Sequence, residues 1–252
     1  MFYIGKKNPV KTQEEQLPGL HTAPDWPARL ASLAAQTRNP ILKAFYEAGT
    51  VAADTPISKV PLLAMDFETT GIDSTRDEIV SIGLVAMSLE RIRMGESHHW
   101  ILKPRADLRD ESVVIHGITH SEVESAPDLK SIRQQLLELM AGRVIVVHHR
   151  GIERQFLDAA FKRRTGEGIA FPCIDTMELE ARLHRRKRPS LLERLMGHKR
   201  VSIRLPESRE RYHLPHYPAH NALTDALACA ELLQAQIAHR FSPQTPIAKL
   251  WS

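Results

Sequence analysis

The run Leu62-Leu63-Ala64-Met65 leads directly into Asp66-Phe67-Glu68-Thr69-Thr70-Gly71, and this junction constrains the fold more than any other part of the chain. The apolar run predicts a buried strand. Because side chains alternate between the two faces of a strand, Asp66 and Glu68 point the same way and Phe67 points into the core. Two carboxylates on one face of a buried strand repel each other unless a cation lies between them, and Mg²⁺ and Mn²⁺ prefer such oxygen ligands. The alternative is a strand that simply ends in solvated acids.

The composition is that of a globular protein with enough chain to bury a core. Of the 252 residues, 42% are hydrophobic and 25% are charged. No apolar run is long enough to predict a membrane span, and the N-terminus lacks the layout of a signal peptide. Cys173 and Cys229 are the only cysteines, which indicates a reducing compartment and predicts a cytoplasmic location.

Positive charge is concentrated in residues 182–213. This segment carries eleven Lys and Arg residues against three Glu, a local charge of +8, whereas the whole chain has +4 and the remainder therefore −4. Such a segment predicts attraction of a polyanion, and Arg185, Arg186, Lys187 and Arg188 lie at its centre. The alternative is a solvated helix face.

The pattern of the chain predicts three parts. Residues 1–59 form a partly helical extension, with Asp25 and Asn39 as the caps of two short helices. Residues 60–240 form the main α/β domain, and residues 241–252 form a tail. We identify no internal repeat and no low-complexity block.

Within the main domain, apolar and alternating segments predict five strands followed or separated by helical segments. The expected strands are 62–68, 78–88, 96–102, 144–147 and 171–174. The expected helical segments are 110–140, 151–164, 176–186, 190–197 and 221–238. Short connections between the first three strands predict an antiparallel meander, so the fold class is α/β, with a mixed sheet flanked by helices on both faces.

A second candidate for chemistry is His220-Asn221-Ala222-Leu223-Thr224-Asp225, where a loop enters the last helix. Either Asn221 or Thr224 can cap that helix. A loop histidine leaning over a helix-borne carboxylate suits a general base, because its pKa lies near working pH. In the alternative, His220 is solvated and Asp225 stabilises the helix dipole.

A third candidate is Glu153, which follows the strand 144–147 in the first turn of a helix. It can point back toward the strand ends, or it can simply be an acid placed favourably at a helix N-terminus. His148 and His149 form a pair at the strand end, and we do not assign them as metal ligands.

Taken together, Asp66-x-Glu68, Glu153, His220 and Asp225 resemble the ordered motifs of the DEDD exonucleases, histidine subtype. This is the superfamily of the proofreading epsilon subunit of bacterial DNA polymerase, RNase T and oligoribonuclease. The resemblance runs from about Pro61 to Ala238 and includes Ile115-His116-Gly117-Ile118-Thr119. It implies an RNase H-like fold for the mixed five-stranded sheet, with the short helical extension as an appendage.

The resemblance implies a 3′→5′ exonuclease that uses two divalent ions, Mg²⁺ or Mn²⁺, and releases nucleoside 5′-monophosphates from single-stranded DNA or DNA ends. It implies that Asp66 bridges the two ions, that Glu68 and Asp225 hold one of them, and that Glu153 holds the other. His220 is then the general base. The resemblance further implies that Thr69, Thr70 and His116 line the terminal nucleotide pocket; the alternative is that they serve turn formation and packing.

The chain departs from the family at Glu153, where the usual residue is Asp. The longer side chain predicts altered metal affinity or preference. Two alternatives to a DNA exonuclease stay open: an exoribonuclease of the same fold, like RNase T or oligoribonuclease, and a catalytically weakened nucleic-acid-binding module.

The expected partner is single-stranded nucleic acid, DNA before RNA, and no membrane. The tail Gln244-Thr245-Pro246-Ile247-Ala248-Lys249-Leu250-Trp251 vaguely resembles sliding-clamp-binding peptides, so a clamp or polymerase is a weaker expectation. We favour a tail that packs on its own domain.

Overall fold

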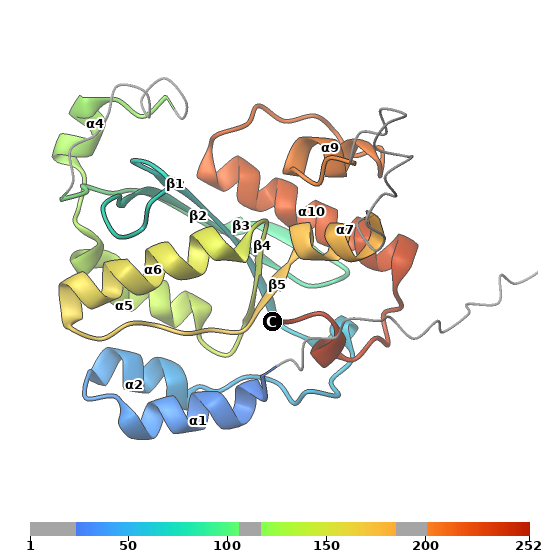
Figure 1. Ribbon diagram of the computed structural model, residues 1–252, viewed down its shortest axis with the longest axis horizontal. Helices are drawn as coiled ribbons and strands as arrows, with labels where there is room; N and C mark the ends of the chain where they lie inside the picture. Colours follow the sequence, from blue (N-terminus) through green and yellow to red (C-terminus); the bar gives the residue numbers. More distant parts are fainter. Residues whose placement is uncertain (1–23, 106–116, 185–200) are drawn as a thin grey trace, which may run out of the picture.

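The computed structural model describes residues 24–105, 117–184 and 201–252 of the protein. A mixed five-stranded sheet lies at its centre, in the order β3-β2-β1-β4-β5 (Figure 1). The strands are β1 (Leu62–Thr69), β2 (Ile79–Met87), β3 (Ile92–Ile101), β4 (Val144–Val147) and β5 (Cys173–Asp175). Strands β1, β2 and β3 are antiparallel neighbours, whereas β4 and β5 run parallel to β1. The predicted mixed five-stranded sheet is therefore confirmed.

The third strand begins earlier than its sequence pattern predicts, at Ile92 instead of residue 96. A tight turn, in which the backbone N–H of Ser88 donates to the carbonyl of Arg91, pairs Ile92 directly with Met87. Pairing of Ile92 and Arg93 with β2 thus starts β3 ahead of a register shift, and the exposed residues 93–96 carry no apolar alternation of their own.

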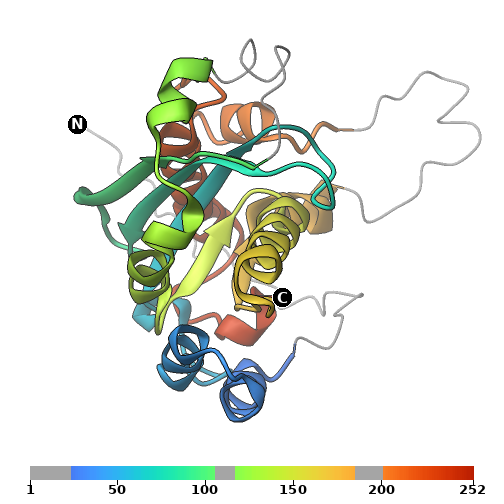
Figure 2. The same cartoon turned by 90° about the vertical axis from the view of Figure 1, so that its left-hand side faces the viewer.

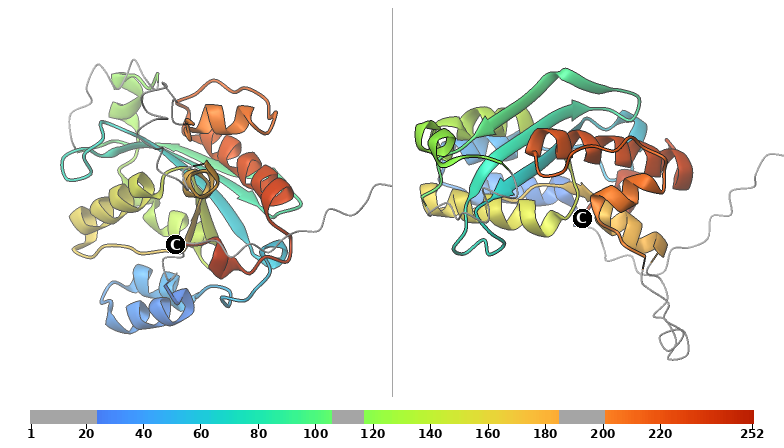
Figure 3. Two further views of the ribbon diagram at one scale, coloured as in Figure 1. Left: turned by 45° about the vertical axis from the view of Figure 1, so that its right-hand side comes forward. Right: turned by 90° about the horizontal axis from the view of Figure 1, so that it is seen from above.

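Helices cover both faces of the sheet, as predicted. They are α4 (His120–Ser125), α5 (Leu129–Met140), α6 (Arg150–Thr165), α7 (Thr176–His184), α9 (Leu205–Glu210) and α10 (Ala222–Arg240). Figures 1 and 3 show α5 and α6 on one side of the sheet and α7, α9 and α10 on the other. The helical pattern over 110–140 resolves, from residue 117 on, into α4 and α5, because Pro127 interrupts it and Asp128 caps α5. The short helix expected at 190–197 lies outside the described residues.

The N-terminal extension contributes α1 (Trp26–Gln36) and α2 (Pro40–Glu47), which form a hairpin below the sheet (Figure 2). The predicted caps are present: the Asp25 side chain accepts from the backbone of Ala28, and Asn39 accepts from that of Ile41. Trp26, at 2% exposed, belongs to the same apolar core as β1 and β4.

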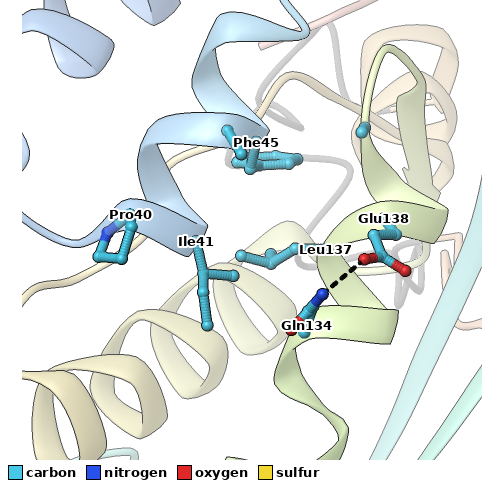
Figure 4. Close-up of a pocket in the computed structure, with 8 residues that line it drawn as sticks. Pro40, Ile41, Phe45, Gln134, Leu137 and Glu138 are labelled. Carbon is cyan, nitrogen blue, oxygen red and sulfur yellow. Dashed lines mark hydrogen bonds between the residues drawn. The ribbon is translucent and has the colours of Figure 1, made fainter.

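An apolar pocket of about 270 Å³ lies between α2 and α5 (Figure 4). Its two polar lining residues bond each other, since Gln134 Nε2 donates to Glu138 Oε1 at 3.0 Å. None of the predicted site residues lines it. Among the described helices, none combines the length and apolarity that crossing a lipid bilayer requires.

Candidate active site

Strand β1 presents the first two acids at its carboxyl end. Asp66 pairs in register with Gly83 of β2, and Glu68 pairs with Ser81. The register shifts between Glu68 and Thr69, where the strand leaves regular pairing. Both acids therefore lie on one face of the sheet, at the point where the backbone turns away from it.

Helix α10 brings Asp225 to the same place. Asn221 is the N-cap: its side chain accepts from the backbone of Thr224 at 3.1 Å. Asp225 therefore lies in the first turn of α10. Carboxylate oxygens of Asp66, Glu68 and Asp225 all lie within 4.8 Å of one another. Residues far apart in sequence thus converge into a group with the oxygen donors that a hard divalent cation prefers.

Glycine at position 83 permits this approach. A Cβ atom built on Gly83 would lie 2.2 Å from the carbonyl carbon and oxygen of Ala222, the first residue of α10. No side chain fits in that space, so the first turn of α10 rests directly on the backbone of β2 beside Asp66.

His220 lies immediately before the α10 cap, in an exposed position with a left-handed backbone (φ 69°). Its backbone N–H donates to Asp225 Oδ2 at 2.8 Å. The main chain of His220 is therefore held next to Asp225. The residue is exposed, so its imidazole is accessible to solvent.

Glu153 is set apart from the other three acids. It lies in the first turn of α6 and is 3% exposed, and it is not a member of the group within 4.8 Å. Its Oε2 is buried and has no hydrogen-bond partner. It nevertheless faces the group closely enough that its charge acts on Asp66. A buried carboxylate oxygen without a donor is costly, so this oxygen is suited to a ligand that brings positive charge.

The four acids Asp66, Glu68, Glu153 and Asp225 form a group of carboxyl groups whose negative charges are unfavourable in this environment. Burial raises the pKa of Asp66 well above its ordinary value, and the charges of Glu153, Asp225 and Glu68 raise it further. Burial of Glu68 and, to a smaller extent, the negative charge of Asp225 raise the pKa of Glu68 to about 7. Burial also raises the pKa of Asp225, although the His220 N–H opposes it. Within the described parts of the chain, no salt bridge neutralises any of the four. The donor set therefore fits divalent cations.

Asp175 is a site neighbour that the sequence patterns did not single out. It ends β5, is 6% exposed, and accepts from the backbone N–H groups of Arg150 and Met177. Its charge, after burial, raises the pKa of Glu153. An acid directly after an apolar strand and before a helix was the available signal, since strand ends gather at one edge of such a sheet.

The histidine pair at the end of β4 has structural contacts. His148 Nδ1 lies 2.8 Å from Thr176 Oγ1, and Nε2 lies 3.1 Å from the carbonyl of Ile203. Burial lowers the pKa of His148 to about 4. His149 occupies the N-cap position of α6 with φ 115°. Neither is a member of the carboxylate group of Asp66, Glu68 and Asp225.

The two threonines after β1 make local contacts. Thr69 Oγ1 donates to the carbonyl of Gly71 at 2.6 Å, and buried Thr70 accepts from the backbone N–H of Glu78 at 3.0 Å. These contacts match turn formation and packing, the alternative that the sequence left open. In the same loop, four residues after Glu68, Ile72 is 95% exposed, so a large apolar side chain is presented to solvent. His116 lies outside the described residues.

Much of the described positive charge in 182–213 is already paired. Arg182 pairs with Glu178, Arg209 with Glu231, and Arg211 with Glu180. The charges of these three arginines are therefore already paired with carboxylates of the protein itself. The four basic residues at 185–188, on which the expectation of phosphate attraction depends, lie outside the described residues.

The tail packs on its own domain. Ile247, Leu250 and Trp251 are at most 2% exposed, and Trp251 forms a bridge to Ile174 of β5. The apolar side chains that a clamp-binding peptide would present are thus buried in this structure.

Solved structures share this architecture. Cell-death related nuclease 4 aligns with a TM-score of 0.58 at 23% identity over 73% of this chain and 65% of its own. The nuclease domain of 3′hExo, a DEDDh family member, aligns with a TM-score of 0.58 at 14% identity, and the match covers 71% of this chain and 92% of that domain. Exonuclease I from Methylocaldum szegediense aligns with a TM-score of 0.57 at 20% identity, and the match covers 73% of this chain and 42% of that enzyme. The fold is therefore that of the RNase H-like exonucleases.

Residues 63–233 match the model of the RNase T exonuclease family, and the chain belongs to this family. Among curated relatives, DNA polymerase III PolC-type of Thermotoga petrophila is 28% identical over 71% of this chain and 12% of its own length. A DNA polymerase III subunit epsilon-like protein of Rhodobacter capsulatus is 29% identical over 71% of this chain and 24% of its own. The chain thus spans less than a quarter of these relatives' length. The predicted membership of the DEDD superfamily is confirmed.

Proposed function

We propose that the protein is a metal-dependent 3′→5′ exonuclease that shortens single-stranded DNA or DNA ends and releases nucleoside 5′-monophosphates. The single observation that carries the proposal is the convergence of Asp66, Glu68 and Asp225 within 4.8 Å in a member of the exonuclease family. We assign this activity to residues 60–240, with 1–59 and 241–252 as accessory segments.

Asp66, Glu68 and Asp225 would hold one Mg²⁺ or Mn²⁺ ion, and Asp66 together with Glu153 a second. When bound, such a pair of ions stabilises the attacking and leaving oxygens of an in-line displacement at phosphorus. The protein supplies the rest. The raised pKa values of Asp66 and Glu68 support this assignment, because a site that disfavours several free negative charges gains from a bound cation.

His220 would take the proton of the attacking water. Its position in the exposed loop beside Asp225 allows the imidazole to reach a water at the edge of the carboxylate group. Asp225 holds the histidine main chain in place through the 2.8 Å hydrogen bond.

Substrate contacts would come from the loop after β1. The exposed Ile72 side chain is suited to lie against the face of a terminal base, because apolar contact with a base needs no sequence-specific hydrogen bond. Thr69, Thr70 and His116 are proposed as further lining residues of the nucleotide pocket. The DNA polymerase III names of the relatives favour DNA over RNA and make polymerase association a proposal to test.

The test uses 5′-labelled DNA and RNA oligonucleotides with Mg²⁺, Mn²⁺ or EDTA. We expect a 3′-shortening ladder on DNA with either metal and none with EDTA. Asp66→Ala and Asp225→Ala should each abolish the ladder while thermal unfolding shows a folded protein. A ladder on RNA alone would instead identify an exoribonuclease. Oligonucleotide binding with no ladder under any metal would identify the binding module and overturn the proposal.

A further inference from the structure

Two segments at opposite ends of the exonuclease domain carry the same short sequence. Thr55-Pro56-Ile57-Ser58-Lys59-Val60 directly precedes β1, and Thr245-Pro246-Ile247-Ala248-Lys249-Leu250 follows α10. We call them the first and the second Thr-Pro-Ile segment. Four identities in a single pair of segments 190 residues apart do not form a periodic pattern, so the pair is not recognisable as an internal repeat from the sequence.

The two segments have the same conformation. Each forms a short 3₁₀ turn, η1 (Ile57–Lys59) and η2 (Ile247–Lys249), and the prolines before them both have φ −58° and ψ 138°. Burial matches position by position: both isoleucines are 0% exposed, and both lysines are exposed. A shared sequence thus gives a shared structure.

The two segments bind each other reciprocally. The backbone N–H of Ile57 donates to the carbonyl of Thr245 at 2.9 Å, and that of Ile247 donates to the carbonyl of Thr55, also at 2.9 Å. One residue further on, Ser58 donates to Pro243 at 3.1 Å, and Ala248 donates to Ala53 at 3.0 Å. Pro56 and Pro246 form the bridge between the two segments.

This pattern, in which residue i bonds residue j and the equivalent of j bonds the equivalent of i, is that of a two-fold symmetric contact. Here it occurs within one chain, between two copies of one motif. Such a contact is self-complementary, so the groups that the first segment offers to its partner are the groups that the second segment offers in return.

We propose that the first Thr-Pro-Ile segment is a docking site for a Thr-Pro-Ile-x-Lys-apolar peptide, and that the tail of the same chain is its occupant. Recognition comes from the motif itself: proline sets the extended backbone, the following isoleucine is buried, and the paired N–H and carbonyl groups fix the register. An identical segment supplied in trans, including that of a second copy of this chain, would satisfy the same groups.

The docking site lies far from the proposed chemistry. Leu62, next to the first segment, is about 20 Å along β1 from Glu68 at a rise of about 3.3 Å per residue. Arg240, the last residue of α10 before the second segment, is about 22 Å along that helix from Asp225 at about 1.5 Å per residue. Loss of docking should therefore lower stability and leave turnover of oligonucleotides unchanged, so this proposal and the proposed function can fail independently.

The first experiment compares two variants of the full chain by thermal unfolding. The copy-swap variant gives the tail the residues of the first copy: Ser242→Ala, Pro243→Ala, Gln244→Asp, Ala248→Ser and Leu250→Val. The order-swap variant, Thr245→Pro with Pro246→Thr, keeps the tail composition and removes the N–H of residue 245, which donates to Ser242.

We expect the copy-swap variant to unfold within about 2 °C of the parent and the order-swap variant to unfold about 6 °C lower or more. Equal losses in both variants, or no loss in either, would overturn the proposal, because the motif would then not direct the contact.

The second experiment adds labelled peptides to the order-swap variant. Peptides of residues 52–61 and of residues 242–252 should both bind saturably, with dissociation constants within about threefold of each other, and both should raise its unfolding temperature. The same peptides with Thr and Pro exchanged should not. Binding by the 242–252 peptide alone would contradict the proposal, since Trp251 and not the shared motif would then carry recognition.

Discussion

Gly83 and Ala222 lie in direct backbone contact, and this contact places two of the proposed metal ligands together. The first turn of α10 rests on β2 at Gly83, whose register partner on β1 is Asp66, and Asp225 follows three residues after Ala222. The distance between Asp66 and Asp225 is thus set by a glycine that carries no chemistry of its own.

Gly83→Ala should separate the acids. A methyl group would need space that the Ala222 backbone occupies at 2.2 Å, so α10 must move away from the sheet. We expect nuclease activity to fall about 100-fold or more and stability to fall by about 1–3 kcal/mol. Gly95→Ala is the matched control, since nothing lies within 4 Å of a Cβ there. Parental activity in Gly83→Ala would contradict this account of the site.

Glu153 should show opposite effects on stability and activity. Its buried Oε2 has no hydrogen-bond partner, and its charge acts on Asp66. Because burial and Asp175 raise the pKa of Glu153, Glu153→Gln should raise the unfolding temperature in EDTA increasingly as pH rises and the buried group would have to ionise, and it should lower activity at least about tenfold. Glu153→Asp keeps the charge and should retain or raise activity. Inactive Glu153→Asp would show that the site is built around the longer side chain.

The metal-free protein should lose stability as pH rises. Glu68 has an ordinary pKa of 4.5 and a folded value of about 7, so the folded state holds this proton more tightly than the unfolded state does. The resulting stabilisation is complete below the unfolded pKa and is lost as pH rises through about 7. We therefore compare the unfolding temperatures of the parent and of Glu68→Gln in EDTA. The difference, parent minus variant, should become smaller as the pH is raised from 5.5 to 8.

Added Mn²⁺ should oppose that fall, because ligand binding requires the ionised acids and grows stronger as they lose their protons. The stabilisation by Mn²⁺ should accordingly be larger at pH 8 than at pH 5.5. A parent and Glu68→Gln that follow parallel curves in EDTA would show that Glu68 does not retain its proton.

The loop that carries His220 is anchored to α10 by a buried arginine. Arg209, at 4% exposed, donates to the carbonyl groups of Ala228 and Pro215 and pairs with Glu231, which also accepts from the Tyr217 hydroxyl at 2.9 Å. Tyr217 lies three residues before His220, so this anchor limits where the imidazole can be.

Tyr217→Phe should therefore lower kcat about tenfold with KM nearly unchanged, since it loosens a group that acts only in the chemical step. Tyr46→Phe serves as control, because the Tyr46 hydroxyl lies within hydrogen-bond distance of Gly168 and Ala170, away from that loop. Equal effects of the two changes on kcat would remove the positioning role from Tyr217.

Local patterns in the sequence were enough to predict most of the fold. The apolar runs at 62–65 and 144–147 form β1 and β4, and Asp25 and Asn39 cap the two helices expected after them. These features depend on neighbours in the chain, so periodicity and capping preferences reveal them. Asp66, Glu68 and Asp225 also lie at the ends of regular elements, but they were assigned to one site from the order of the family's motifs, because no local pattern shows that they meet.

Features that arise from long-range packing were not predicted. Helix α9 is only six residues long, and Arg209 within it is held by contacts to α10. The role of Asp175 depends on β5 lying beside β4, and the pairing of the Thr-Pro-Ile segments depends on the two ends of the domain meeting. No local pattern contains that information, because the partners are distant in sequence.

The central claim is that Asp66, Glu68 and Asp225 hold divalent cations at the end of a nucleic acid strand. The most direct measurement is anomalous diffraction from crystals grown with Mn²⁺ and a nucleoside 5′-monophosphate. We predict an anomalous peak bonded to oxygens of all three acids and to the phosphate, with a second near Glu153, and loss of the first peak in Asp225→Ala. A fully occupied nucleotide with no Mn²⁺ peak at these acids would contradict the account.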